Sequence, residues 1–166
     1  MAGHSLNFVV GELDAGTHLI ERALSLNPNM AATWHFSGWA QVWLDKPDLA
    51  IAHLLRAMHL SPLDLFTDSM QAATADAHFF ADRYGEAALW ANRVLREYPD
   101  SHMALRIAIV SNALGGSMDA AKKASNLLLQ LDPSFRISQL REVLGPLQPG
   151  AIRKYEEGLR KAGLAE

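Results

Sequence analysis

Histidines and carboxylates are the residues of this sequence that could do chemistry, and their spacing argues against most of it. The chain has seven histidines, but no two lie four apart on one helical face and no His-Glu-x-x-His signature occurs. Zinc needs three or four converging ligands, so we expect no metal site. Gly115 and Gly116 are followed by no Lys-Ser or Lys-Thr pair and therefore form no phosphate-binding loop.

One enzyme hypothesis is left by these residue types. His78, Asp76 and Asp82 fall on one predicted helix and could form an acid-base group. No recognisable motif surrounds them, and the serines lack a nucleophile motif. We therefore expect a non-enzymatic chain with no catalytic residue and no cofactor.

The densest cluster of aromatic side chains points to binding rather than to catalysis. Trp34, Trp39 and Trp43 fall within ten consecutive positions. Because His35, Trp39 and Trp43 recur every four residues, they share one face of a helix, whereas Trp34 lies on another. Such a face either packs in a core or receives an apolar partner.

Composition narrows the classes of partner and compartment. Lys and Arg number 15 against 18 Asp and Glu, which gives a net charge of -3 and no basic stripe for nucleic acid. No run reaches the roughly 18 uncharged apolar residues of a membrane helix, and the N-terminus shows no signal peptide. The absence of cysteine fits a reducing compartment, so we expect a cytoplasmic protein that binds neither nucleic acid nor membranes.

The chain repeats itself at intervals close to 34 residues. Four apolar runs each end in a proline, and these prolines are separated by 34, 37 and 34 residues: Pro28, Pro62, Pro99 and Pro133. A small or polar residue stands fourteen positions before each proline: Asp14, Asp48, Gly85 and Asp119. A second residue typical of turns stands three positions before each of those: Gly11, Asp45, Asp82 and Gly116. A fixed period of this kind predicts a repeat architecture.

Each repeat is predicted to be a pair of antiparallel helices. Asp48 could accept hydrogen bonds from the unpaired amides of a first helical turn, so we expect it to be an N-cap. Pro62 places the end of that helix near Leu60. Upstream, residues 32–44 have one glycine as their sole breaker, which predicts the first helix of the pair. Since no segment alternates with a period of two, the fold class is all-α.

The repeat resembles the tetratricopeptide repeat (TPR) family. The best-matching unit carries the family's residues at six places: Trp34, Gly38, Ala50, Leu54, Ala57 and Pro62. The family's tyrosine is replaced by Gln41, His78 and Asn112 in successive units. The resemblance implies an alpha-alpha superhelix, a solenoid, over residues 1–135. Its expected units are an incomplete first repeat and three complete ones: 1–30, 31–64, 68–101 and 102–135.

Residues 136–166 follow the last repeat and are expected to form a C-terminal helical cap. The helical candidates are residues 138–144 and 151–162, with Ile152, Tyr155 and Leu159 on one face of the second. A solenoid needs such a cap because each repeat buries its apolar face only against a neighbour. Placing Pro28 in register starts its repeat before Met1, so we expect a longer parent protein.

Three phrases are similar to the C-terminal TPR region of bacterial class III adenylate or guanylate cyclases: residues 37–39, 57–64 and 155–164. This narrower resemblance implies a bacterial signalling protein with a catalytic domain upstream, none of which is in this chain. The alternative is the repeat tail of a winged-helix transcriptional regulator.

The resemblance also implies a concave groove as the partner-binding site. Carrying the register of His35 through the repeats gives these candidates: His35, Trp39, Val42, Trp43, Asp76, Phe79, Phe80 and Arg106. An aromatic groove with two opposite charges suits an apolar or amphipathic helical segment. The competing interpretation is that the Trp and Phe residues are core, in contact across adjacent first helices.

We therefore expect a non-catalytic protein–protein interaction or regulatory module. Its partner is a protein or peptide segment, from the parent chain, a second copy or another protein. The Lys and Asn of the family's two-carboxylate clamp are missing, because those places hold His35, Trp39, Ala73, Met103 and Ile107. Binding of a chaperone tail is not expected. The alternative function is self-association, in which either the groove or the uncovered N-terminal face pairs two chains; the N-terminal residues are Leu6, Phe8, Val9 and Val10.

Overall fold

A computed structural model describes residues 13–166, and every regular element in that range is a helix. The elements are α2 (Leu13–Leu26), α3 (Ala31–Trp43), α4 (Pro47–Leu60), α5 (Thr67–Phe80), α6 (Tyr84–Glu97), α7 (His102–Leu114), α8 (Met118–Leu131), η2 (Ile137–Gln139), α9 (Leu140–Val143) and α10 (Pro149–Lys161). The predicted all-α class is confirmed. No helix between residues 13 and 166 has the length and hydropathy to cross a membrane.

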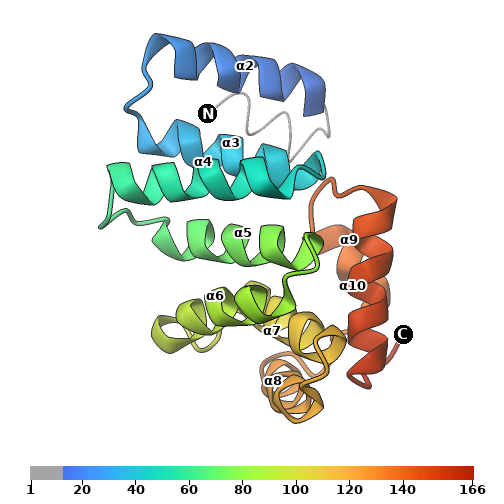
Figure 1. Ribbon diagram of the computed structural model, residues 1–166. Helices are drawn as coiled ribbons and strands as arrows, with labels where there is room; N and C mark the ends of the chain where they lie inside the picture. The colour runs from blue at the N-terminus through green and yellow to red at the C-terminus, as the bar shows by residue number, and fades with distance from the viewer. Residues whose placement is uncertain (1–12) are drawn as a thin grey trace.

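Successive helices pack as antiparallel pairs, and the pairs stack into a curved array (Figure 1). The pairs α3–α4, α5–α6 and α7–α8 lie at the three repeats predicted as complete, and α2 lies where the second helix of the incomplete first repeat is predicted. The array is an alpha-alpha solenoid, as predicted. The predicted remnant of a first helix at Leu6–Val10, and with it the proposed self-association residues, lies outside the described part of the chain.

The turn inside each pair is built the same way in all three repeats. Asp45, Asp82 and Gly116 take positive φ angles of 56°, 60° and 86°. The next amide then donates to the carbonyl five residues back, as in Lys46 N to Gln41 O at 2.9 Å. This left-handed residue with a long-range amide bond is a Schellman C-cap, which aspartate tolerates and glycine favours. The residues found in register in the sequence therefore end the first helices.

The second helices begin earlier than predicted. Asp48 is not the N-cap of α4, because the helix already starts at Pro47 and Lys46 holds the capping position without a side-chain bond. Proline suits the first helical position, where its missing N–H would have no partner. Asp48 instead lies in the first turn and accepts a hydrogen bond from Arg83 Nη1 at 2.8 Å. The predicted end of this helix at Leu60 is confirmed.

Small residues allow the two helices of a pair to approach closely. A Cβ atom added to Gly38 of α3 would lie 2.5 Å from Leu54 Cγ of α4. Ala50 and Ala57 are fully buried on the opposing helix. These are the TPR-matching positions, so their residue types are explained by the packing between α3 and α4.

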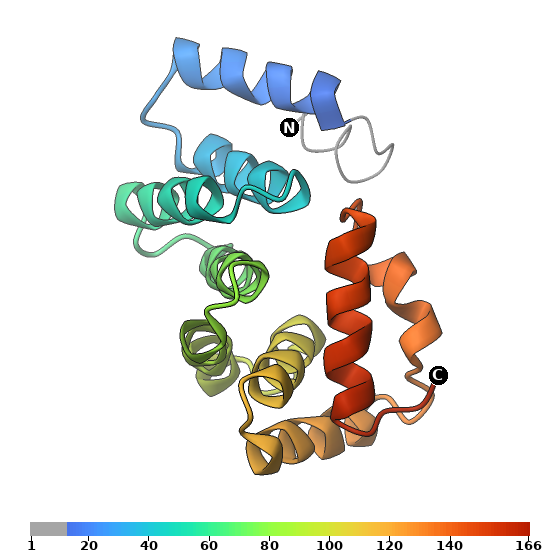
Figure 2. The same ribbon diagram turned by 45° about the vertical axis from the view of Figure 1, so that its right-hand side comes forward.

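The C-terminal segment, η2 to α10, turns back across the inner side of the array. Figure 2 shows α10 standing along the open side of the curve formed by the repeats. The predicted apolar face of α10, with Ile152, Tyr155 and Leu159, is buried. The segment does more than cap the last repeat, because Gln148 reaches the carbonyl of Trp43 in α3. An amphipathic helix and an aromatic concave face bury each other's apolar surface.

Candidate functional site

The concave face, formed by the first helices α3, α5 and α7, is covered at one end by α10. Lys154 Nζ donates to the carbonyls of Phe79 and Phe80 at 2.8 and 3.3 Å. The ring of Tyr155 packs edge-on against that of Phe79, with centroids 5.1 Å apart. Gly158 fits against Val110 so tightly that an added Cβ would lie 2.7 Å from the Val110 Cβ. We call this part the covered half: Val42, Phe79, Phe80 and Val110.

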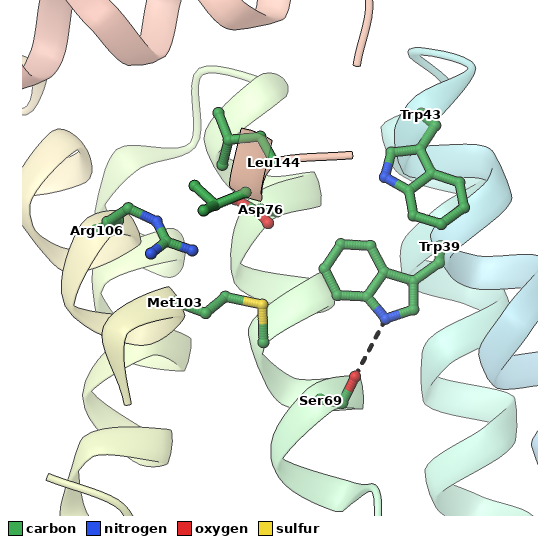
Figure 3. A pocket seen from close by; sticks show the side chains of 8 residues that line it. Trp39, Trp43, Ser69, Asp76, Met103, Arg106 and Leu144 are labelled. Carbon is green, nitrogen blue, oxygen red and sulfur yellow. Dashed lines mark hydrogen bonds between the residues drawn. The ribbon is translucent and has the colours of Figure 1, made fainter. Parts of the chain in front are cut away.

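The other end of the concave face holds a cavity of about 240 Å³, which we call the indole pocket. Side chains from α3, α5 and α7 form three walls, and the end of α9 with the residue after it forms the fourth (Figure 3). The lining residues are Trp39, Trp43, Ser69, Asp76, Met103, Arg106, Val143 and Leu144.

Two stacked indoles form the α3 wall of the pocket. The rings of Trp39 and Trp43 lie 5.8 Å apart between centroids, inclined by 28°. Trp39 Nε1 donates to Ser69 Oγ on α5 at 3.2 Å, and His35 Nε2 lies 3.1 Å from the same oxygen. Trp43 is buried whereas Trp39 is half-buried. The Ser69 hydroxyl thus fixes the orientation of the more accessible indole.

Asp76 is a buried carboxyl on the α5 wall, and it is joined to α10. The Tyr155 hydroxyl donates to Asp76 Oδ1 at 2.6 Å. Burial raises the pKa of Asp76 to about 7, although the Tyr155 hydrogen bond and the positive charge of Arg106 act in the opposite direction. Burial beside this carboxyl also raises the pKa of Tyr155 well above its usual value. The pair therefore links the pocket to the C-terminal segment.

Arg106 on α7 supplies the positive charge of the pocket. Its side chain is 8% exposed, and its guanidinium points into the cavity in Figure 3. Its Nε has no hydrogen-bond partner among the described residues. Arg106 holds the place in its repeat that His35 holds two repeats earlier, so the solenoid register itself brings it to the concave face.

The predicted partner-binding residues are divided between the two ends. Four of them line the indole pocket: Trp39, Trp43, Asp76 and Arg106. His35 is not in the lining, but its Nε2 contacts the hydroxyl of Ser69, which is part of it. Val42, Phe79 and Phe80 pack under α10.

Sequence reasoning missed four lining residues: Ser69, Met103, Val143 and Leu144. Ser69 and Met103 stand 34 residues apart, at the same place in successive repeats, and the register could have identified them. Val143 and Leu144 lie after the last repeat, so the register could not predict that they line the pocket.

The residues of the enzyme hypothesis enter three separate interactions. Asp76 accepts a hydrogen bond from Tyr155, while Asp82 pairs with Lys154 Nζ at 2.7 Å and accepts from Tyr84. His78 Nδ1 accepts a hydrogen bond from Arg83 Nε at 3.1 Å. These side chains form no common site, because each has a different partner. Within residues 13–166, no three histidines or carboxylates are grouped so that they could hold a metal ion.

Comparison with known proteins supports the fold. No protein-family model matches the chain, and no curated protein sequence matches it. A solved structure of MamA matches with a TM-score of 0.68 and 19% identity over 92% of this chain and 90% of that one. A structure described as MamA MSR-1 C2 matches with a TM-score of 0.67 and 23% identity over 79% of this chain and 73% of that one. At these identities the likeness shows a shared helical-repeat solenoid.

Proposed function

We propose that this chain is a non-catalytic interaction module, acting in the cytoplasm, whose indole pocket binds a segment of a partner protein. The observation that carries the proposal is the contrast along one face. The covered half is occupied by the chain's own α10, whereas a cavity of about 240 Å³ remains beside it. Aromatic residues around a partly desolvated cavity are the usual anchors of a protein interface.

The residue types of the pocket support this role. Met103 offers a flexible thioether that adapts to the shape of a ligand, and Trp39 offers a rigid surface held by Ser69. The covered half also shows what the concave face accepts. It holds an amphipathic helix whose apolar side chains pack into the face and whose Lys154 donates to carbonyls at the C-terminal end of α5. A partner segment of similar character suits the adjoining pocket.

Selection from a displayed random peptide library would test this proposal. We expect peptides that bind the wild-type chain and lose about thirtyfold in affinity on Trp39→Ala, the effect of an aromatic hot spot. The control is Leu89→Ala, since Leu89 is 71% exposed on α6, away from the pocket lining. Circular dichroism must show both variants folded. Peptides that bind Trp39→Ala as tightly as wild type would reject the pocket as their site.

Self-association is the alternative function. Light scattering over a dilution series would distinguish it, because a dimerising element dissociates on dilution while an adaptor stays monomeric throughout. A concentration-dependent dimer that survives Trp39→Ala would favour this alternative over peptide binding in the pocket.

We further propose that the module serves a bacterial nucleotide cyclase. The support is the sequence resemblance, and one of its phrases, residues 155–164, includes Tyr155 and Gly158, which hold α10 against the concave face. The reading frame upstream of Leu6 tests this directly. A class III cyclase domain there would support the proposal, and a winged-helix domain or an unrelated sequence would refute it.

A further inference from the structure

Arg106 introduces a buried positive charge that has no ion-pair partner among residues 13–166. Across the described residues, no carboxylate oxygen lies within 4.0 Å of its guanidinium, and its Nε donates no hydrogen bond. The side chain is nevertheless 8% exposed. Removing most of a guanidinium from water with no carboxylate oxygen within ion-pair distance is costly, so such an arrangement is typical of a site that a ligand completes.

Asp76 is the one carboxyl among the lining residues, and although the charge of Arg106 acts on it, the two side chains form no ion pair within 4.0 Å. Its Oδ1 is engaged by the Tyr155 hydroxyl at 2.6 Å. Burial raises its pKa to about 7, so much of the Asp76 population is uncharged near neutral pH. When Asp76 is uncharged, the lining carries the positive charge of Arg106 and no negative group.

We infer that the indole pocket binds a carboxylate carried on a short apolar stem, with Arg106 as the partner of the carboxylate. This inference rests on the proposed function, since it names the chemistry of the ligand at the same site. A guanidinium matches a planar carboxylate with two parallel N–H donors. The stem would lie between the indole of Trp39 and the apolar side chains of Met103 and Leu144, which also line the cavity.

The size and charge of the pocket set the limits of the ligand class. Arg106 is the one basic residue in the lining, so a dianionic phosphate would find too few donors. A volume of about 240 Å³ is smaller than typical drug-sized sites of roughly 300 to 1,000 Å³. One amino-acid-sized group fits this description, as a free acid or as the last residue of a peptide.

The test compares 3-phenylpropanoate with its neutral analogue 3-phenylpropanamide on the wild-type chain. Two-dimensional NMR follows the indole N–H signals of Trp39 and Trp43, which report the location of binding. We expect the acid to bind about tenfold more tightly than the amide and to move these signals. Equal binding of acid and amide, or no shift of either indole at saturating acid, would overturn the inference.

Variants of Arg106 sharpen the test. Arg106→Met should remove the preference for acid over amide, and Arg106→Lys should keep part of it because the charge remains. Arg56→Met, at an exposed position on α4, is the matched control and should leave the preference intact. If Arg106→Met does not fold, the acid-to-amide ratio of the wild-type chain and of Arg106→Lys still decides the question. An unchanged ratio in a folded Arg106→Met would refute the role of Arg106.

A peptide arm separates the source of the carboxylate from the proposed function. A tripeptide ending in phenylalanine is measured with a free and with an amidated C-terminus. Tighter binding of the free form than of phenylpropanoate identifies a peptide terminus, and the reverse identifies a free acid. If the library-selected peptides bind through Trp39 but neither acid is preferred over its amide, the carboxylate inference fails while the interaction module stands. If the acids bind and no peptide does, the interaction module fails.

Discussion

The covered half and the indole pocket belong to one concave face, and both are rich in aromatic side chains. They differ in what α10 supplies. Over the covered half, Tyr155 packs on Phe79 and Lys154 donates to two backbone carbonyls. The apolar surface there is therefore buried, and these carbonyls are hydrogen-bonded. Beside the indole pocket, Arg106 keeps an unpaired Nε among the described residues. The two halves therefore share their aromatic content and differ in how fully their polar groups are paired within residues 13–166.

Phe79→Ala should give the largest loss of stability. Phe79 is fully buried beneath Tyr155, so its truncation should lower the free energy of unfolding by about 3 to 5 kcal/mol in a urea titration. Trp39→Ala, at a half-buried position, should cost less and act mainly on peptide affinity. Equal losses for the two variants would mean that both halves form a single core.

Asp76→Asn should change how stability depends on pH. The folded pKa of about 7 lies above the unfolded value of 3.8, so the stability that Asp76 contributes is complete below pH 4 and is lost as the pH rises to 7. Between pH 5 and pH 8, wild type should lose about 2 to 3 kcal/mol more than Asp76→Asn. Urea titrations of both chains measure this. Parallel profiles would show that Asp76 has an ordinary pKa, which also removes one argument for the net charge of the pocket.

Gly158→Ala should loosen the covered half without altering the pocket walls on α3. The new Cβ would lie 2.7 Å from the Cβ and 3.0 Å from the Cα of Val110, so α10 must shift. This shift should lower the free energy of unfolding by roughly 1 to 3 kcal/mol. Limited proteolysis should then cleave the C-terminal segment sooner. Gly150→Ala is the matched control, because its Cβ would have no neighbour closer than 3.9 Å. Identical digestion of both variants would contradict tight docking at Gly158.

Ser69→Ala should have the smallest effect on stability, and its effect should be confined to the indole pocket. It removes the acceptor of Trp39 Nε1 and the partner of His35, at a cost of about 1 kcal/mol in a thermal or urea melt. The indole N–H signal of Trp39 should broaden or move, while that of Trp90 stays in place. An unchanged Trp39 signal would show that Ser69 does not fix the indole.

The repeat array could be predicted from sequence because its signals are local and recur. Pro62 marks the end of α4 at Leu60, and Asp45 and Asp82 mark turns that the structure shows in left-handed conformation. The placement of Asp48 was wrong by about two residues, since Pro47 can itself begin a helix.

The position of the C-terminal segment could not be predicted in the same way. A period tells which helices are neighbours in an array, but α10 lies outside the period. Its docking depends on single pairs such as Gly158 with Val110 and Tyr155 with Asp76. The register of His35 was enough to predict half of the residues that line the pocket. It could not predict that α10 covers one half of the groove and leaves the other open.

The hydrogen bonds of Lys154 to α5 also bear on the order in which the molecule forms. They join residues 75 and 74 positions apart, whereas the two helices of each pair are adjacent in the chain. Contacts between adjacent helices form quickly, and closing a longer loop costs more entropy. During synthesis the residues of α3, α5 and α7 leave the ribosome before those of α10. In a nascent chain the concave face is therefore exposed for a time, and α10 covers Phe79 and Phe80 only after the repeats have been made.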